Sequence, residues 1–316
     1  MRLANLNVYK VRPGEEDSVR SRARATAIRE MAPDVLTIQE VLVDTADRQG
    51  WDDAAAEILR RLAADCGLAC SVPEGPAEVA MAHNVHQPWY TAILWNPDTV
   101  APIRGSFRAI GAPDFWHGVT TLGLDVGARE PLTVASYHGD PFRPDARYNE
   151  ALRLKGFYRR TGRVKSGVLL GDFNSVSAAP SPTGGYYDTE PYTGQDHDDL
   201  EYQCVPETIG GSNLADRRPS AALLRRGFMA DAAAYLGAPW QPTVSYWRDG
   251  EGDPDPWGER RIDLILPTQP VAPALTGYGV HVSEASTAAS DHRPVWIDLD
   301  PSNISRSTAV RQLGGS

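Results

Sequence analysis

Eight polar side chains with metal-binding or proton-transfer chemistry stand within or at the end of short apolar runs along this chain. They are Asn7, Glu40, His138, Asp172, Asn174, Asp263, Asp291 and His292. Hard oxygen donors without cysteine suit Mg²⁺, Mn²⁺ or Ca²⁺ better than structural zinc. The two histidines add groups that titrate near neutral pH. Together these residue types predict a divalent-metal site with acid–base groups beside it.

Each of these residues also has a purely structural interpretation when it is considered alone. The alternatives are a solvated strand-end acid for Glu40, a turn residue for Asn7, a tight turn for Asp172 and Asn174, a partner of Arg260 or Arg261 for Asp263, and a loop pair for Asp291 and His292. Their repeated placement at the ends of predicted strands favours one common site.

The apolar pattern predicts the strands and helices that would position this site. Predicted strands cover residues 2–8, 35–38, 89–95, a segment near Val100, 119–126, 132–138, 168–170, 261–266, 280–283 and 294–299, and predicted helices cover 20–31, 51–65 and 151–158. Strand ends in a layered α/β fold converge on one rim, so side chains far apart in the sequence can meet there.

The order of six short motifs resembles the endonuclease/exonuclease/phosphatase (DNase I-like) superfamily. The motifs are Asn7, Gln39-Glu40, His138, Gly171-Asp172-Phe173-Asn174, Arg261-Ile262-Asp263 and Ser290-Asp291-His292-Arg293-Pro294-Val295. Each motif is short, but their joint occurrence in the family order is specific. The resemblance implies a four-layered α/β sandwich, in which two packed mixed β-sheets are flanked by helices. It also implies cleavage of phosphoester bonds with Mg²⁺ or Mn²⁺.

The resemblance further implies which residues bind the metal. Asn7 and Glu40 would hold the principal ion, and Asp291 would join them directly or through water. Asn5 is the alternative first-strand ligand, but Asn7 is preferred because it stands at the strand end before Val8. Asp172 and Asn174 are also candidate ligands.

Catalytic roles follow from the same resemblance. Asp172 and Asn174 would face the attacking water and a phosphoryl oxygen. His138 would donate to the phosphoryl group, and His292, oriented by Asp263, would act at the phosphate. The metal neutralises charge in the transition state, and a carboxylate-held imidazole stays in one tautomer.

Two segments stand apart from the strand and helix pattern. Residues 177–219 are rich in Pro, Gly and Tyr, and a stretch this long without periodicity is usually a functional loop. We expect it to cap the site as an insertion within a single domain of residues 1–300, with hinges at Gly184, Gly185, Gly210 and Gly211. Residues 301–316 are polar and predict a flexible C-terminal tail.

The composition, 41% hydrophobic and 23% charged over 316 residues, is that of an ordinary globular protein. No apolar run approaches the roughly 20 residues of a membrane span, and the first residues lack a signal-peptide pattern, so we expect a cytoplasmic protein. The three cysteines are too few for a disulfide scaffold or a metal site.

Other conspicuous side chains have structural interpretations. We expect His83, His86 and His197 at the surface and Trp89, Trp95 and Trp296 in the core, whereas Arg147 either lines the groove or packs on its helix.

The net charge of the chain and the acidic residues of one segment indicate which class of substrate is favoured. The net charge is −10, from 31 Lys and Arg against 41 Asp and Glu, and residues 188–216 hold eight acids and no Lys or Arg. Tight sequence-blind binding to nucleic acid needs a basic surface, and an acidic loop beside the site would repel a long polyanion. A small phosphorylated metabolite, nucleotide or lipid headgroup is therefore favoured over DNA or RNA. A catalytically inactive binding module is the second alternative, but every catalytic position is filled. Protein partners cannot be named from the sequence.

Overall fold

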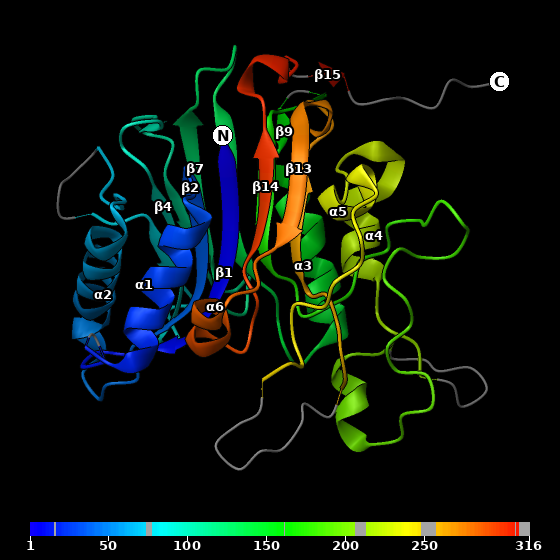
Figure 1. The fold of residues 1–316 in the computed structure, drawn as a ribbon, viewed down its shortest axis with the longest axis horizontal. Helices are drawn as coiled ribbons and strands as arrows, with labels where there is room; N and C mark the ends of the chain where they lie inside the picture. Colours follow the sequence, from blue (N-terminus) through cyan, green and yellow to red (C-terminus); the bar gives the residue numbers. More distant parts are fainter. Residues whose placement is uncertain are drawn as a thin grey trace.

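Two mixed β-sheets form the centre of the protein (Figure 1). The computed structural model describes residues 1–15, 17–73, 78–160, 162–205, 213–247, 257–306 and 308–309. The first sheet has the strand order β13-β14-β1-β2-β4-β3. Its strands are β1 (Arg2–Val11), β2 (Val35–Leu42), β3 (Met81–His83), β4 (Trp89–Trp95), β13 (Leu275–Val280) and β14 (Val295–Leu299).

The second sheet has the order β12-β11-β8-β7-β5, with β6 also paired to β7. Its strands are β5 (Ala101–Pro102), β6 (Arg108–Ile110), β7 (Val119–Asp125), β8 (Leu132–His138), β11 (Gly167–Asp172) and β12 (Asp263–Pro267). A small third sheet joins β9 (Arg159–Arg160), β10 (Arg163–Val164) and β15 (Thr308–Ala309).

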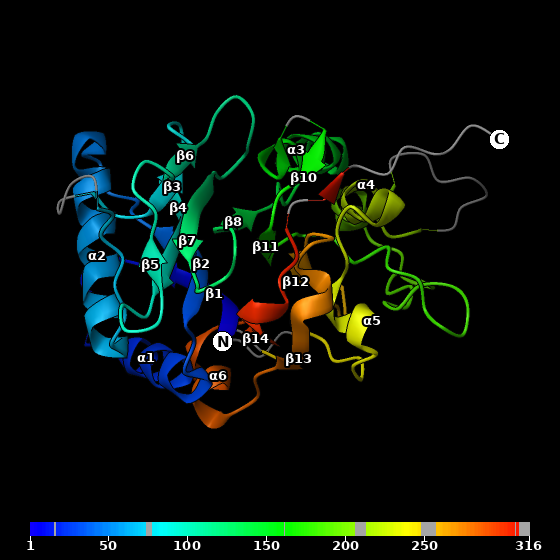
Figure 2. The same ribbon diagram turned by 90° about the horizontal axis from the view of Figure 1, so that it is seen from above.

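Helices cover the outer faces of the two large sheets (Figure 2). They are α1 (Val19–Met31), α2 (Trp51–Cys66), α3 (Pro144–Phe157), α4 (Arg218–Leu224), α5 (Ala232–Leu236) and α6 (Glu284–Ala289), with short 3₁₀ turns η1 (Arg48–Gly50), η2 (Asp198–Tyr202), η4 (Arg225–Gly227), η5 (Ala272–Ala274) and η6 (Pro301–Asn303). Among the described residues, no helix is long and apolar enough to cross a membrane.

Three apolar layers hold this arrangement together. Side chains of α1 and α2 pack on the first sheet, the facing sides of the two sheets pack on each other, and α3 and α4 pack on the second sheet. Leu170 and Leu169, neighbours on β11, point to opposite layers, because successive side chains of a strand alternate between its faces. The predicted four-layered α/β sandwich is therefore confirmed.

The predicted strand at residues 280–283 is wrong. The strand β13 ends at Val280, and Ser283 instead caps the N-terminus of α6, accepting a hydrogen bond from the backbone N–H of Ser286. A serine at this position provides the acceptor that the first turn of a helix lacks. Within the predicted C-terminal tail, Pro301–Asn303 forms η6 and Thr308–Ala309 pairs with β10, whereas residues 307 and 310–316 lie outside the described part.

The described part of the segment 177–219 packs on the main fold through its own small core. Val176, Tyr192, Leu200 and Cys204 cluster with Val244 and Ile262. The segment also contributes Asp188, which is buried and accepts two hydrogen bonds from Arg261, at 2.8 and 3.0 Å. The proposed hinges Gly210 and Gly211 lie outside the described residues, whereas Gly184 and Gly185 both have positive φ.

Candidate active site

Strand pairing brings the sequence-predicted residues to one rim, at the lower edge of the sheets in Figure 1. The strands β1 and β2 run parallel, as do β8 and β11, so the carboxyl ends of each pair share an edge. His138 stands directly opposite Asp172, and Asp172 stands opposite Asp263 at the start of β12. The strand β14 runs antiparallel to β1, so the segment before it delivers Asp291 and His292 to the same edge.

The backbone turns sharply where several of these strands end. Glu40, Asn174, Tyr9 and Lys10 all have left-handed backbone conformations, with φ between 47° and 68°. The register of β2 shifts on both sides at this point. Such conformations cost on the order of 1–3 kcal/mol each and occur mostly at functional sites. Here they aim the Glu40 and Asn174 side chains at the rim.

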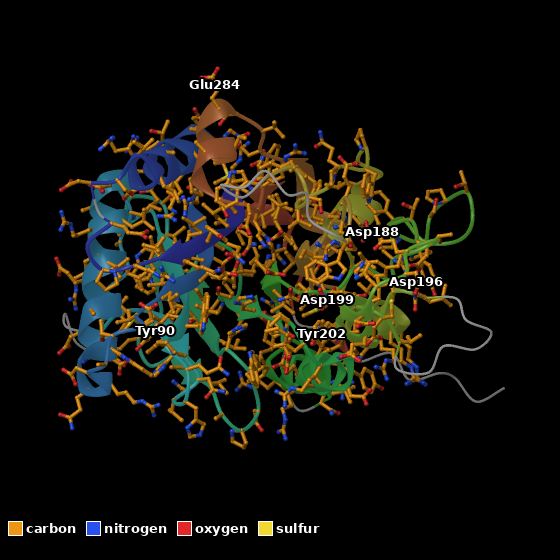
Figure 3. The ribbon with its side chains drawn as sticks, turned by 90° about the horizontal axis from the view of Figure 1, so that it is seen from below. Tyr90, Asp188, Asp196, Asp199, Tyr202 and Glu284 are labelled. Carbon is orange, nitrogen blue, oxygen red and sulfur yellow. The ribbon has the colours of Figure 1, made fainter. Side chains whose placement is uncertain are left out.

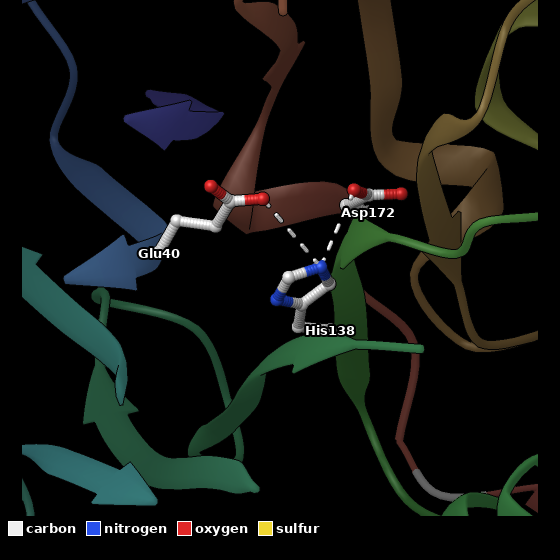
Figure 4. A group of neighbouring side chains, drawn as sticks. All are labelled: Glu40, His138 and Asp172. Atoms are coloured by element: carbon white, nitrogen blue, oxygen red, sulfur yellow. Dashed lines mark ion pairs between the residues drawn. The ribbon is translucent and has the colours of Figure 1, made fainter. Parts of the chain in front are cut away.

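One group of side chains has metal-ligand geometry (Figure 4). Ligand atoms of Glu40, His138 and Asp172 all lie within 4.8 Å of one another. The His138 Nε2 atom is 3.5 Å from Asp172 Oδ2 and 4.0 Å from Glu40 Oε1. Asn7 is fully buried, and its amide Nδ2 donates to Glu40 at 3.0 Å and to Asp172 at 3.2 Å. Asn7, Glu40 and Asp172 therefore meet, as predicted, and His138 joins them.

The electrostatics of this group favour a bound cation. Burial, with the negative charge of Asp291, raises the pKa of Glu40 to about 7, and burial raises the pKa of Asp172 to about 6. Within the described residues, the buried Glu40 Oε2 atom has no hydrogen-bond partner. An orphaned carboxylate oxygen beside two more buried acids fits a divalent metal with oxygen ligands. Asp291 lies outside the 4.8 Å group but is close enough for its charge to act on Glu40.

A histidine–aspartate pair completes the rim. His292 Nδ1 is 2.8 Å from Asp263 Oδ2, and His292 Nε2 is 3.7 Å from Asp172. Burial alone would lower the pKa of His292, but the charges of Asp263 and Asp172 hold it well above its ordinary value. Burial, together with repulsion from the neighbouring imidazoles of His117 and His292, instead lowers the pKa of His138 well below its ordinary value. One imidazole is thus held charged and the other neutral.

The remaining predicted residues support this geometry. The Asn174 amide donates to the Gly139 carbonyl at 3.1 Å, and its backbone N–H donates to Asp172 Oδ1 at 2.8 Å. Asn5 lies one step behind the rim, where its amide donates to Asp263 at 3.4 Å and its oxygen accepts from Gln39 at 2.9 Å. Of the two first-strand candidates, Asn7 is the one beside Glu40.

Glycine at two positions keeps the two central strands close. A Cβ atom on Gly139 would lie 2.6 Å from the Phe173 carbonyl oxygen, and one on Gly171 would lie 1.8 Å from that of Tyr137. Both distances are shorter than a real contact. The His138 loop can therefore approach the Asp172 turn only with glycine there.

His117 is a rim residue that the sequence analysis missed. Its ring stacks on His138 at a centroid distance of 3.8 Å, and burial lowers its pKa to about 4. His117 lies in the loop before β7, and a single histidine ahead of a strand has no spacing that marks it. The stack restricts the orientation of the His138 ring.

Arg147, which had two alternative placements, packs under the rim. It is fully buried, and its guanidinium donates to the carbonyls of Asp140 and Tyr202. It thereby ties η2 of the segment 177–219 to the loop that follows His138.

The other conspicuous residues lie apart from the metal group. His83 stacks on Tyr90 beside α2, a region that Figure 3 places well away from Asp188 and Tyr202. His197 contacts Gln195 at 3.1 Å, and His86 is exposed. Trp95 is a core residue, whereas Trp89 and Trp296 are only half-buried. The cysteines are free, and burial raises the pKa of each thiol.

An open cleft of about 550 Å³ lies along α3, between the loop that carries His117 and the loop that follows His138. Its lining includes Asp140, two residues after His138, and Trp116, next to His117. Arg143 lies over the Trp116 ring at 4.4 Å and pairs with Asp140 at 2.6 Å. The cleft thus presents a guanidinium and an aromatic face, and none of the eight candidate site residues lines it.

Solved structures of several known proteins have the same fold. A mannosyl-6-phosphatase from Bacteroides thetaiotaomicron is 14% identical, with 95% of this chain and 99% of that chain covered and a TM-score of 0.55. An AP endonuclease from Archaeoglobus fulgidus is 19% identical, with 95% and 99% covered and a TM-score of 0.54. ANGEL2, a 2′,3′-cyclic phosphatase, is 15% identical, with 94% and 93% covered and a TM-score of 0.56.

At these identities the likeness shows a common fold, and the three proteins act on different substrates. A comparison with curated sequences found no match. The sequence profile of the Endonuclease/Exonuclease/phosphatase family, however, matches residues 4–292, a range that contains all eight candidate site residues. The chain belongs to the endonuclease/exonuclease/phosphatase family.

Proposed function

We propose that this protein is a divalent-metal-dependent phosphoester hydrolase that acts on a small phosphorylated metabolite, nucleotide or lipid headgroup. The observation that carries the proposal is the meeting of Glu40, Asp172 and His138 beside the His292–Asp263 pair. Carboxylates for a metal, one charged imidazole and one neutral imidazole are the groups that phosphoryl transfer to water requires.

Each side chain has a defined part in this proposal. Asn7, Glu40 and Asp172 would hold Mg²⁺ or Mn²⁺, with Asn174 and Asp291 at its margin; the bound ion would neutralise charge on the phosphoryl oxygens. His292, kept protonated by Asp263, would donate to a phosphoryl oxygen. His138, kept neutral and stacked on His117, would donate from the opposite side. Asp172 and Asn174 would orient the attacking water.

The preference for a small substrate rests on the cleft beside His138 more than on the acidic segment. Three of the eight acids in residues 188–216 are paired: Asp188 with Arg261, Glu190 with Arg217, and Asp216 with Arg218. The segment therefore repels polyanions less than its composition predicts. The cleft, with Arg143 and Trp116, suits a compact organic group next to the phosphate.

Nuclease activity on DNA or RNA is the alternative, and an inactive binding module is the second alternative. A panel of nucleotides, phosphosugars, phosphoinositides, supercoiled DNA and single-stranded RNA, assayed with Mg²⁺ and with Mn²⁺, separates these possibilities. We expect turnover of a small phosphorylated compound that disappears in EDTA and returns with either metal. Full activity after exhaustive chelation would refute metal dependence, and faster turnover of a polymer would favour the nuclease.

A further inference from the structure

A cavity far from the rim collects positive charge on this acidic protein. It has a volume of about 190 Å³ and lies between the end of α3, the turn η4 and the strand β10. Four cationic side chains line it, namely Lys155, Arg159, Arg225 and Arg226, together with Val164, Phe228 and Gln269. None of these lining residues is an acid. This concentration of cations is the opposite of what a net charge of −10 predicts.

Two of the four cations contact the Phe228 ring, and three of the four are exposed and not neutralised. The Lys155 ammonium lies 4.7 Å above the Phe228 ring and donates to the Ala222 carbonyl, and the Arg159 guanidinium lies 5.4 Å from the same ring. Within the described ranges, Arg159, Arg225 and Arg226 form no ion pair with a carboxylate.

The local electrostatics agree with this geometry. Burial and the charges of Arg159, Arg225 and Arg226 lower the pKa of Lys155. Arg226 has a left-handed backbone with φ of 61°, a conformation that is unfavourable for a residue with a side chain. The fold thus keeps like charges together at some cost in stability, and a multiply charged anion would relieve their repulsion.

A second cavity continues the first. It has a volume of about 390 Å³, shares Lys155 and Arg225 with the cationic cavity, and is otherwise lined by Tyr148, Leu152, Arg218, Ala221 and Ala222. Arg218 is already paired with Asp216 and Asp145. The new surface in this second cavity is therefore mainly apolar and aromatic, which suits an uncharged organic group.

We propose that these two cavities form a binding site for an organic oligophosphate, such as a nucleoside triphosphate. The phosphates would lie among Lys155, Arg159, Arg225 and Arg226, and the organic group would lie against Tyr148 and Leu152. A single-stranded nucleic acid is the less suitable ligand, because such polymers need cations distributed along a groove and here they surround one small cavity. The proposal does not rest on the proposed catalytic function, and the two cavities share only Leu152 with the cleft lined by Trp116 and Asp140.

The site is also separate from the active-site rim. The helix α3 begins at Pro144, six residues after His138, and its 14 residues place Lys155 near the other end, roughly 17 Å from Pro144 by helix geometry. Arg159 follows just beyond the helix, in β9. Binding here can therefore be tested without the catalytic metal.

The test is calorimetric titration with ATP, tripolyphosphate, adenosine and a 12-nucleotide single-stranded DNA, all in EDTA. We expect ATP to bind at least as tightly as tripolyphosphate and more tightly than the DNA, and adenosine not to bind. Arg225→Gln/Arg226→Gln, and separately Arg159→Gln, should weaken ATP binding about tenfold or more. All three side chains are exposed, so folding should be unaffected.

Two controls make the result specific. Arg104→Gln/Arg108→Gln removes two exposed arginines elsewhere, and His292→Ala removes a rim residue; both should bind ATP like the wild type. Absence of ATP binding to the wild type, equal loss in the Arg104/Arg108 variant, or loss in His292→Ala would overturn the proposed site. Tighter binding of the DNA would make it a polymer site, and weaker binding of ATP than of tripolyphosphate would overturn the role of the second cavity.

Discussion

Two clusters of buried charge flank the start of β12, only two residues apart in the sequence, and they differ in how their charge is balanced. Arg261 is fully buried between Asp188 and Asp231, with ion pairs of 2.8 and 2.7 Å. At the rim, four carboxyl groups, those of Glu40, Asp172, Asp263 and Asp291, lie near His292, whose pKa is raised, whereas the pKa values of His117 and His138 are lowered.

The difference separates structural charge from charge that awaits a ligand. In the Arg261 cluster, the acids and the base satisfy one another, and breaking such a buried pair leaves an uncompensated charge. At the rim, burial raises the pKa of three carboxyl groups, Glu40, Asp172 and Asp291. Charged His292 offsets only part of this negative charge, and buried charge that is not fully balanced is unfavourable, so a bound metal is expected to stabilise the rim.

The largest expected effect is on the charged imidazole of the rim. His292→Ala should lower turnover about 10³-fold or more, because the donor that stabilises transition-state charge is lost. Asp263→Asn should cost less, since the imidazole remains but loses orientation and charge. Steady-state kinetics with Mg²⁺ measure both. Near wild-type turnover in a folded His292→Ala protein would show that the pair is not catalytic.

Removing the cation of the Arg261 cluster should lower the stability of the folded protein. Arg261→Met leaves Asp188 and Asp231 buried without a cation, and we expect a loss of about 3–5 kcal/mol in the free energy of unfolding. Chemical denaturation measures it, with Arg153→Met, an exposed arginine paired to Asp114, as the control that should change little. If Arg261→Met is as stable as that control, the cluster is not what holds the segment 177–219.

Removing a carboxylate from the rim should raise the free energy of unfolding of the metal-free protein, whereas removing Arg261 should lower it. The pKa of Glu40 rises from 4.5 to about 7 in the folded protein. The unfolded chain therefore releases this proton first as the pH rises, and the metal-free protein loses stability between about pH 4.5 and pH 7. Glu40→Gln should abolish this loss and stabilise the metal-free protein at pH 8 by about 2–3 kcal/mol.

The same variant should lose the stabilisation that Mg²⁺ gives the wild type. Thermal unfolding with and without Mg²⁺ measures both effects, and Glu57→Gln, an exposed acid on α2, is the matched control. A Glu40→Gln protein that is less stable than the wild type without metal, or that still gains from Mg²⁺, would contradict the interpretation of the rim as charge awaiting a cation.

The sequence predicted which residues meet at the rim better than it predicted the charged and aromatic contacts around the rim. Glu40, His138 and Asp172 stand at the ends of apolar runs, and strand pairing alone brings such ends together, so the spacing contained the necessary information. The motif resemblance also implied the pair of Asp263 with His292, but nothing in the sequence indicated that Arg261, two residues earlier, pairs with Asp188. That choice depends on which face of the extended chain each side chain occupies and on a partner 73 residues away.

Short elements and packed rings were beyond the sequence for other physical reasons. Two-residue strands such as β9 and β10 have no measurable periodicity. His117 is recognisable only through its stack on His138. The acidic segment was misjudged because its composition does not reveal that Arg217, Arg218 and Arg261, all outside residues 188–216, pair with three of its acids.

The smallest expected effect concerns the acids of that segment that are not paired in this way. Asp196, Asp198, Asp199 and Glu201 lie in or next to η2, and Figure 3 places Asp196 and Asp199 on the same side of the molecule as Tyr202. The Tyr202 ring is 5.7 Å from the ring of Phe142, which lies in the loop after His138, so η2 borders the approach to the rim.

Asp188 and Tyr192 of the same segment are buried. Replacing residues 183–211 as a whole would therefore disrupt the fold instead of testing the cap. Neutralising the four acids, as Asp196→Asn/Asp198→Asn/Asp199→Asn/Glu201→Gln, isolates their charge. We expect kcat/KM for a short oligonucleotide to rise about threefold to tenfold at low salt, and the gain to vanish near 0.5 M salt, because charges at the surface act over about 10 Å at 0.1 M and less as salt increases. An activated phosphodiester with a single negative charge serves as the matched substrate, and its turnover should change little because one charge is repelled far less than a chain of phosphates. A salt-independent gain on both substrates would mean that η2 hinders access by its bulk, and no gain on the oligonucleotide would mean that the unpaired acids do not set the preference for small substrates.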